Sequence, residues 1–138
     1  MTNMRRKKSN KTLWWVGGAI VVALAAWIAS PGKAADHPNP RPNVTSADVA
    51  PASLYAGYPR VATTYRHTAQ IAELVDGVYC YCRCERNAGH YSLLDCFRTD
   101  HAAGCDICLG EAALAYRMSR QGASLDAIRS AVDHRYGA

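Results

Sequence analysis

The sequence predicts a mainly α-helical protein in which a small cysteine-rich domain follows an N-terminal transmembrane helix and a proline-rich linker. Three observations support this prediction. An uncharged apolar run begins at position 13, all six prolines lie between positions 31 and 59, and all six cysteines lie between positions 80 and 108. After position 60 no proline occurs, and apolar residues recur at helical spacing.

The first twelve residues carry five basic side chains and no acidic one. The whole chain has 16 basic and 11 acidic residues, so the part after this tail carries equal numbers of both, and the net charge of +5 belongs to the tail. No basic surface then remains in the folded domain to neutralise phosphates. A nucleic-acid partner is therefore not expected.

The apolar run from Leu13 to Ala29 follows the basic tail directly. As a helix it is about 26 Å long, close to the roughly 30 Å hydrocarbon core of a bilayer. Three tryptophans lie near its two ends, where indole rings favour the membrane interface. Because basic flanks stay on the cytoplasmic side, we predict a cytoplasmic tail at residues 1–12, a transmembrane anchor at residues 13–30 and an extracytoplasmic C-terminal domain. A cleaved or uncleaved secretory signal has the same parts and stays open.

The segment 31–60 is predicted to be a spacer, because it contains every proline of the chain. Proline lacks an amide donor and drives the preceding residue toward extended backbone, so a semi-stiff and largely unpacked linker is expected. The folded domain is then expected at residues 61–138, outside the cell membrane.

Helices are expected throughout this domain from apolar spacing and from capping residues. The four predicted helices are one through Tyr65 that ends at Asp76-Gly77, one at 93–98 capped by Ser92, one from Cys105 or Asp106 to about Gln121, and one capped by Ser124 that ends at Gly137.

The six cysteines permit three kinds of chemistry. Structural disulfides would staple a small extracytoplasmic domain that has little core of its own. Clustered thiolates would instead hold a soft metal ion such as Cu(I) or Zn(II). A dithiol redox centre is the third interpretation, since a thiol at a helix N-terminus has a lowered pKa. The six cysteines are Cys80, Cys82, Cys84, Cys96, Cys105 and Cys108.

The alternation of Cys80, Cys82 and Cys84 constrains their partners. In an extended chain, side chains two residues apart lie roughly 6 to 7 Å from each other. These three can share a metal only if the chain bends between them, and a disulfide within the triplet would close a small strained ring. Bonds to the three downstream cysteines are therefore expected instead.

Several chemistries lack their sequence signals. A c-type haem needs a histidine directly after its cysteine pair, but Leu109 follows Cys108. The second ligand pair of a zinc finger is missing. The chain shows no serine, histidine and acid arrangement and no glycine-rich phosphate loop, so no catalytic residue is predicted.

The cysteine pattern resembles the PCYCGC-motif family of exported or membrane-attached bacterial proteins, whose function is poorly defined. Tyr79 stands where that motif has proline, and Arg83 stands where it has glycine. The resemblance implies an extracytoplasmic location and a metal or thiol function, but no known reaction. It rests on Cys80-Tyr81-Cys82, Cys84, Asp95-Cys96-Phe97, His101, the run Gly104 to Cys108, and Tyr136-Gly137.

We interpret the cluster as a soft-metal site, for Cu(I) before Zn(II), in a metal chaperone or storage protein. The six cysteines are the candidate ligands, and His90, His101 and Met118 are candidate supplementary ligands. One alternative is a disulfide-stapled interaction module that serves as an accessory subunit of a membrane protein complex. The other is a thiol-disulfide oxidoreductase.

The predicted topology can be tested by proteolysis. Protease added to intact cells should remove the cysteine-rich domain and spare the first twelve residues, since the basic tail is expected to stay in the cytoplasm. Immunoblots against tags at the two ends report both fragments. Protection of the cysteine-rich domain would contradict the predicted orientation.

Overall fold

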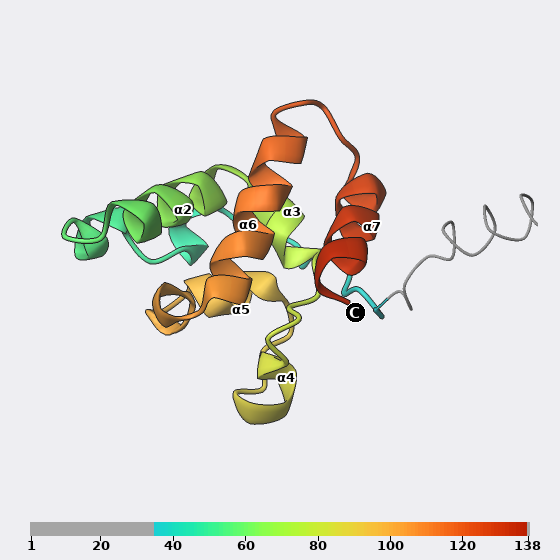
Figure 1. Cartoon of the computed structure of the whole chain (residues 1–138), viewed down its shortest axis with the longest axis horizontal. Helices are drawn as coiled ribbons and strands as arrows, with labels where there is room; N and C mark the ends of the chain where they lie inside the picture. The colour runs from blue at the N-terminus through green and yellow to red at the C-terminus, as the bar shows by residue number, and fades with distance from the viewer. Residues whose placement is uncertain (1–34, 138) are drawn as a thin grey trace, which may run out of the picture. The chain divides into compact units, whose positions relative to one another are not determined.

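The computed structural model describes residues 35–137, which all fall within one compact unit, and helices are the only regular secondary structure there (Figure 1). The prediction of a mainly helical domain is confirmed. The helices are η1 (Ser46–Asp48), η2 (Ala52–Tyr55), α2 (Pro59–Gln70), α3 (Ala72–Asp76), α4 (Cys84–Asn87), α5 (Leu93–Phe97), η3 (His101–Gly104), α6 (Asp106–Ser119) and α7 (Leu125–Tyr136).

The predicted cytoplasmic tail and transmembrane anchor, residues 1–12 and 13–30, lie outside the described residues. Within residues 35–137, none of the helices has both the length and the apolar character needed to cross a membrane.

The helix predicted through Tyr65 is broken in two. Pro59 begins α2, where its missing amide donor has no consequence. At Ile71 the backbone leaves helical geometry, with φ −130° and ψ 31°, and α3 then continues to the predicted end at Gly77. Both helices contribute to the core on either side of this break: Tyr65 of α2 and Val75 of α3 are fully buried.

The two C-terminal helices begin where the sequence predicts. Asp106 is the first residue of α6, and the Ser124 hydroxyl accepts a hydrogen bond from the Ala127 amide at the start of α7. α6 ends at Ser119, two residues before the predicted end. Gly110 lets α7 approach α6 closely, because a Cβ there would collide with the Tyr136 hydroxyl.

Aromatic rings form the centre of the core. Tyr65 lies between Tyr55 and Phe97, with ring centroids 4.3 and 4.9 Å away. The Tyr65 hydroxyl donates to the Thr99 carbonyl, which satisfies its polar end inside the protein. Since Tyr55 belongs to η2, the core draws on a segment that the sequence assigned to the spacer.

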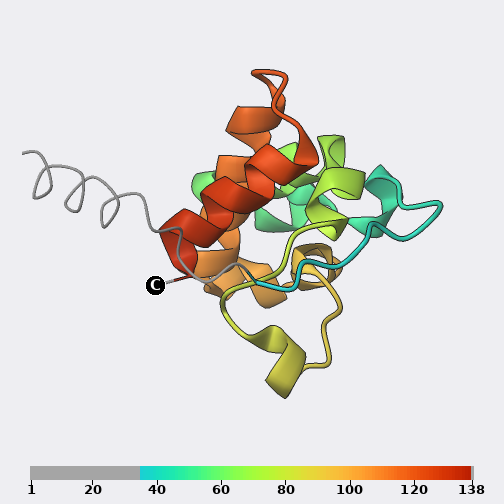
Figure 2. The same cartoon turned by 90° about the vertical axis from the view of Figure 1, so that its right-hand side faces the viewer.

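The described part of the predicted spacer packs against the domain, which corrects the expectation of an unpacked linker. We call residues 35–58 the N-terminal strap. Val49 and Tyr55 are buried, and the Ala50 amide donates to the Phe97 carbonyl at 2.8 Å. Figure 2 shows the beginning of the strap crossing the helical domain. The prolines therefore lie in irregular backbone, but apolar residues between them, such as Val49 and Tyr55, are buried in the core.

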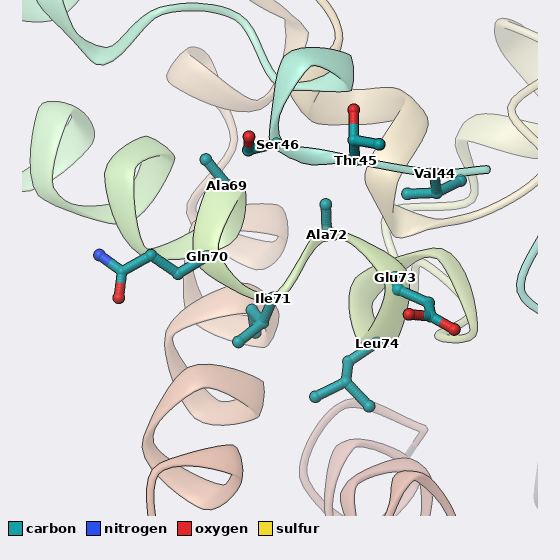
Figure 3. A pocket seen from close by; sticks show the side chains of 9 residues that line it. All are labelled: Val44, Thr45, Ser46, Ala69, Gln70, Ile71, Ala72, Glu73 and Leu74. Atoms are coloured by element: carbon teal, nitrogen blue, oxygen red, sulfur yellow. The ribbon is translucent and has the colours of Figure 1, made fainter.

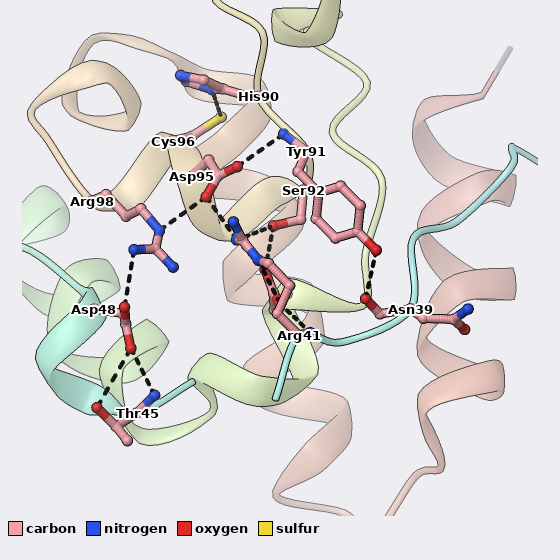
Figure 4. Close-up of polar contacts among 11 residues, drawn as sticks. Asn39, Arg41, Thr45, Asp48, His90, Tyr91, Ser92, Asp95, Cys96 and Arg98 are labelled. Carbon is pink, nitrogen blue, oxygen red and sulfur yellow. Dashed lines mark hydrogen bonds and ion pairs between the residues drawn. The ribbon is translucent and has the colours of Figure 1, made fainter. Parts of the chain in front are cut away.

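Arg41 holds the strap to two helices (Figure 4). Its guanidinium donates to the buried carboxylate of Asp76 and, at 2.7 Å, to Asp95, while its backbone amide donates to Asp76 at 2.7 Å. Ser92 occupies the predicted N-cap of α5, but its hydroxyl donates to Asp76 and makes no capping bond. Burial alone would raise the pKa of Asp76 and of Asp95. The hydrogen bonds and the charge of Arg41 outweigh it, together with the Ser92 hydroxyl at Asp76 and with the Tyr91 amide and the charge of Arg98 at Asp95, and both pKa values stay below the usual range.

We predict that Arg41→Ala lowers the free energy of unfolding by about 3 kcal/mol at pH 7, because Asp76 is then a buried carboxylate without its cation. Chemical denaturation followed by circular dichroism measures this loss. Arg66→Ala is the matched control, since Arg66 is exposed on α2, and it should have little effect.

The effect of Arg41→Ala on the free energy of unfolding should decrease at acid pH. A carboxyl group whose pKa is lowered by folding adds stability above its unfolded pKa, near 3.8 here, and this stability is lost as the pH falls through the folded pKa. The stability difference between the wild type and Arg41→Ala should therefore shrink below about pH 4. A difference that stays constant from pH 7 to pH 3 would contradict the ion-pair interpretation.

Candidate metal centre

Three of the cysteines lie on a hairpin between α3 and α5, residues 78–92, which we call the cysteine hairpin. Its base is closed by a hydrogen bond from the Leu93 amide to the Val78 carbonyl. In Figures 1 and 2 the part that carries α4 projects from the other helices. The hairpin is not strand-like, because Cys84 begins a helical turn.

A left-handed residue makes the bend in this hairpin. Arg83 has φ 60° and ψ 36°, and the Cα atoms of Cys82 and Cys84 lie 5.6 Å apart. Their two sulfur atoms are in disulfide contact. This contact differs from the expectation that the partners of these cysteines lie downstream, because that expectation assumed an extended chain and the left-handed residue bends it.

Two further cysteines reach the hairpin from helices, Cys96 from α5 and Cys108 from α6. The Cys80 sulfur lies 3.1, 3.5 and 3.8 Å from those of Cys82, Cys108 and Cys96, and the Cys82 and Cys108 sulfurs lie 3.4 Å apart. Five sulfur atoms lie within 4.8 Å of one another, and we call them the sulfur cluster: Cys80, Cys82, Cys84, Cys96 and Cys108.

The spacing of the sulfur cluster fits thiolates around a soft cation. Metal–sulfur bonds of about 2.3 Å in a tetrahedral site place sulfur atoms about 3.8 Å apart. The hydrogen-bond distances within the cluster, 3.1 to 3.8 Å, are close to this value. The Cys82 and Cys84 sulfurs lie closer together than this and would have to separate when a metal ion binds.

The buried thiols have no positively charged side chain to favour their ionisation. The contact with Cys108 and burial raise the pKa of the Cys80 thiol. For Cys108 a contact with Cys80 lowers the pKa, but a contact with Cys96 and burial outweigh it, and the pKa is raised. The pKa of Cys108 is thus raised although this residue lies in the first turn of α6. Only a cation inside the cluster would supply the missing counter-charge.

A buried carboxyl group that the sequence analysis missed lies beside these thiols. Glu111 is fully buried, and the pKa of its carboxyl is raised to about 7, mainly by burial. Its Oε1 accepts the Tyr81 amide at 2.8 Å, but its Oε2 has no hydrogen-bond partner. The signal in the sequence was its position three residues after Cys108, which places both side chains on the same face of α6.

Backbone amides of the cysteine hairpin are held by side chains from distant parts of the chain. The Tyr79 amide donates to Nδ1 of His37 at 3.0 Å, so the proton of this imidazole is on Nε2, which donates to Asp133 at 2.8 Å. The Tyr81 hydroxyl also donates to Asp133, at 2.6 Å. Together with Glu111, these contacts anchor the segment 79–81 to the strap, to α6 and to α7.

Both predicted supplementary histidines lie at the outer side of the cluster. His101 Nε2 is 3.0 Å from the Cys84 sulfur, and His90 Nδ1 is 3.2 Å from the Cys96 sulfur. Figure 4 shows the His90 contact. Burial and the nearby His101 lower the pKa of His90, which favours the neutral imidazole that binds metals.

Two other predicted ligands are not brought into the cluster. Cys105 is the N-cap residue of α6, is partly exposed, and is absent from the group of five sulfurs. Met118 lies ten residues after Cys108 on the same helix, about 15 Å along its axis, and packs against the core. The structure therefore favours Cys108 over both as a ligand.

The pocket in Figure 3 lies away from the cysteines, at the break between α2 and α3. Its volume is about 280 Å³, and it is lined by Val44, Thr45, Ser46 and the residues 69–74. Glu73 is its one ionisable lining residue, so the pocket offers no second cluster of ligands or nucleophiles.

Comparison with known families identifies the class of protein. The chain belongs to the family described as "Protein of unknown function with PCYCGC motif", which matches residues 33–138. The match covers the strap as well as the helices, in agreement with their packing as one unit. No curated protein and no solved structure matches the chain.

Arg83 stands at the glycine of the motif and has the left-handed conformation that glycine adopts without strain. We therefore predict that Arg83→Gly raises the free energy of unfolding by about 1 kcal/mol. Arg86→Gly is the matched control, because Arg86 is an exposed residue inside α4, and this change should lower stability by about 0.5–1 kcal/mol. Denaturation curves of both variants under the same redox conditions measure the effects. Equal destabilisation by both substitutions would contradict the left-handed turn.

Proposed function

We propose that this protein binds a soft metal ion, Cu(I) in preference to Zn(II), through the thiolates of the sulfur cluster, and acts in metal storage or delivery outside the cell membrane. The observation that carries the proposal is the convergence of five sulfur atoms within 4.8 Å from three separate elements of the chain. Cysteines that serve only as small apolar core residues are not expected to cluster with their sulfur atoms at one point.

The unpartnered oxygen of Glu111 supports a cation at this position. A buried carboxylate oxygen without a hydrogen-bond partner is costly, since burial penalises its charge. A metal ion in the sulfur cluster would bring a positive charge into the same interior as Oε2. Glu111 is not one of the mutually close donor atoms, so it would balance the charge of the ion and not bind it directly.

Cu(I) is favoured over Zn(II) by the composition of the cluster. Sulfur is the soft ligand that Cu(I) selects, and all five donor atoms of the cluster are sulfur atoms. The ion would replace the thiol protons and hold the cysteine hairpin, α5 and α6 together.

The disulfide-stapled module is the second candidate, and the Cys82–Cys84 contact favours it. A bond between residues two apart closes a very small loop, however, so it constrains the unfolded chain little. The other four cysteines are free thiols. This pairing would therefore not tie the cysteine hairpin to α5 or α6, as a structural staple should.

The thiol-disulfide oxidoreductase is less well supported. Such an enzyme needs an exposed thiol of low pKa, whereas Cys80, Cys96 and Cys108 are buried and the pKa of each is raised.

The location outside the cell membrane is part of the proposal. It rests on the basic tail and the apolar run before position 30, and on no contact of the folded domain. Attachment would keep the metal site close to a membrane protein complex that supplies or receives the ion.

Titration of the fully reduced chain with Cu(I), against a competing chelator, tests the metal site. We predict tight binding by the wild type and a loss of at least tenfold in affinity for Cys108→Ser, because this removes a sulfur ligand from the centre of the cluster. Cys105→Ser is the matched control, since Cys105 lies on the same helix but outside the cluster, and it should keep the wild-type affinity.

The reduced wild type must bind Cu(I) for the proposal to stand. Freshly isolated protein that holds no metal, and whose helicity disappears when its disulfides are reduced, would instead support the disulfide-stapled module. Equal losses for Cys105→Ser and Cys108→Ser would show that the ligand set differs from the sulfur cluster.

A further inference from the structure

We infer that the centre holds two metal ions, which share the thiolates of Cys84 and Cys96. This inference rests on the proposed metal-binding function and extends it from one ion to two. In the reduced protein, the inner ion is bound by four thiolates of the sulfur cluster, those of Cys84 and Cys96 and two of the other three. The outer ion is bound by a second set of ligands, Cys84, His90, Cys96 and His101, which we call the outer group.

The outer group is itself a complete ligand set. Its four donor atoms lie within 4.8 Å of one another, as the five sulfurs of the inner set do. Two thiolates and two imidazoles form a common tetrahedral set for a metal of soft or borderline character. The outer ion therefore needs no donor from outside the described residues.

The two histidines are already directed at the shared sulfurs. His101 Nε2 lies 3.0 Å from the Cys84 sulfur, and His90 Nδ1 lies 3.2 Å from the Cys96 sulfur. Their ring centroids are 4.8 Å apart, with the rings close to perpendicular, so both can face one point without stacking. A small outward movement of each ring would open the space for an ion between the four donors.

A single ion cannot use all these donors. The two sets together hold seven donor atoms, of which two are shared, whereas Cu(I) and Zn(II) bind four or fewer ligands in sites of this kind. A thiolate sulfur has more than one lone pair and can bridge two soft ions. Bridging by Cys84 and Cys96 gives the outer ion four ligands and the inner ion up to four, and both histidines then bind metal.

The two ions would differ in their access to solvent. Cys80, Cys96 and Cys108 of the inner set are buried, whereas His101 of the outer group is exposed. His101 also lines a surface groove of about 500 Å³ between η2, α2 and η3. The outer ion is therefore the one that exchanges with a metal donor or acceptor, while the inner ion is retained.

Counting bound ions in the full chain tests this inference. The reduced protein is loaded with Cu(I), freed of weakly bound metal by gel filtration, and measured by native mass spectrometry. We expect two ions in the wild type and one in the double variant His90→Ala with His101→Ala. The matched control is His67→Ala with His134→Ala, which removes two histidines outside the outer group and should keep two ions.

X-ray absorption of the loaded wild type gives a second measurement that needs no variant. A bridged pair should show nitrogen as well as sulfur ligands and a short metal–metal vector, and both signals should disappear in the His90→Ala, His101→Ala variant. Circular dichroism establishes that this variant is folded.

The outcomes separate this inference from the proposed function. One ion with sulfur ligands alone in the wild type would overturn the two-ion centre and leave the soft-metal function standing. One ion in the wild type and none in the His90→Ala, His101→Ala variant would also overturn the two-ion centre and would indicate a single site with both cysteine and histidine ligands. No bound ion in the reduced wild type would overturn both proposals.

Discussion

The structure depends on the burial of several thiols at one point, where the cysteine hairpin, α5 and α6 meet. Thiols packed this closely in a small domain cannot ionise together, because each negative charge would repel the others in a medium of low dielectric. Glu111 adds a further acidic group to the same interior. The raised pKa values of Cys80, Cys96 and Cys108 favour protonated thiols in the free protein, and a cation in the cluster would favour their thiolates. Metal binding and folding of this region would then be coupled.

The N-terminal strap gives the centre its rigid support. Arg41 connects the strap to Asp76 of α3 and to Asp95 of α5, one residue before Cys96. His37 binds the backbone directly before Cys80. The strap therefore helps to position two of the five sulfurs although it contains no cysteine. It also explains why the family match begins at residue 33 and not at the first long helix.

The cysteine hairpin has a left-handed residue at the position where the motif has glycine, although this residue is Arg83. The left-handed bend at Arg83 is what brings Cys84 back toward Cys82, and Arg83 adopts it despite its side chain. The residues on either side of Arg83 are held by contacts with other parts of the chain. The Tyr81 amide, for example, is held by Glu111, and the Cys84 sulfur contacts His101. Tertiary contacts thus maintain a backbone conformation that the local sequence disfavours.

The sequence by itself determined the helical class, the N-cap at Ser124, the start of α6 at Asp106, and the concentration of cysteine chemistry in one region, because periodicity and capping are local properties of the chain. Only the tertiary structure decided which side chains meet. The selection of Cys108 over Cys105, the burial of Glu111 and the packing of the strap all depend on how α6 and the strap lie against the hairpin. The pairing of Cys82 with Cys84 depended on one dihedral angle at Arg83, for which an arginine gives no signal. Contacts between residues far apart in the chain are set by the whole core, and a local pattern carries no information about them.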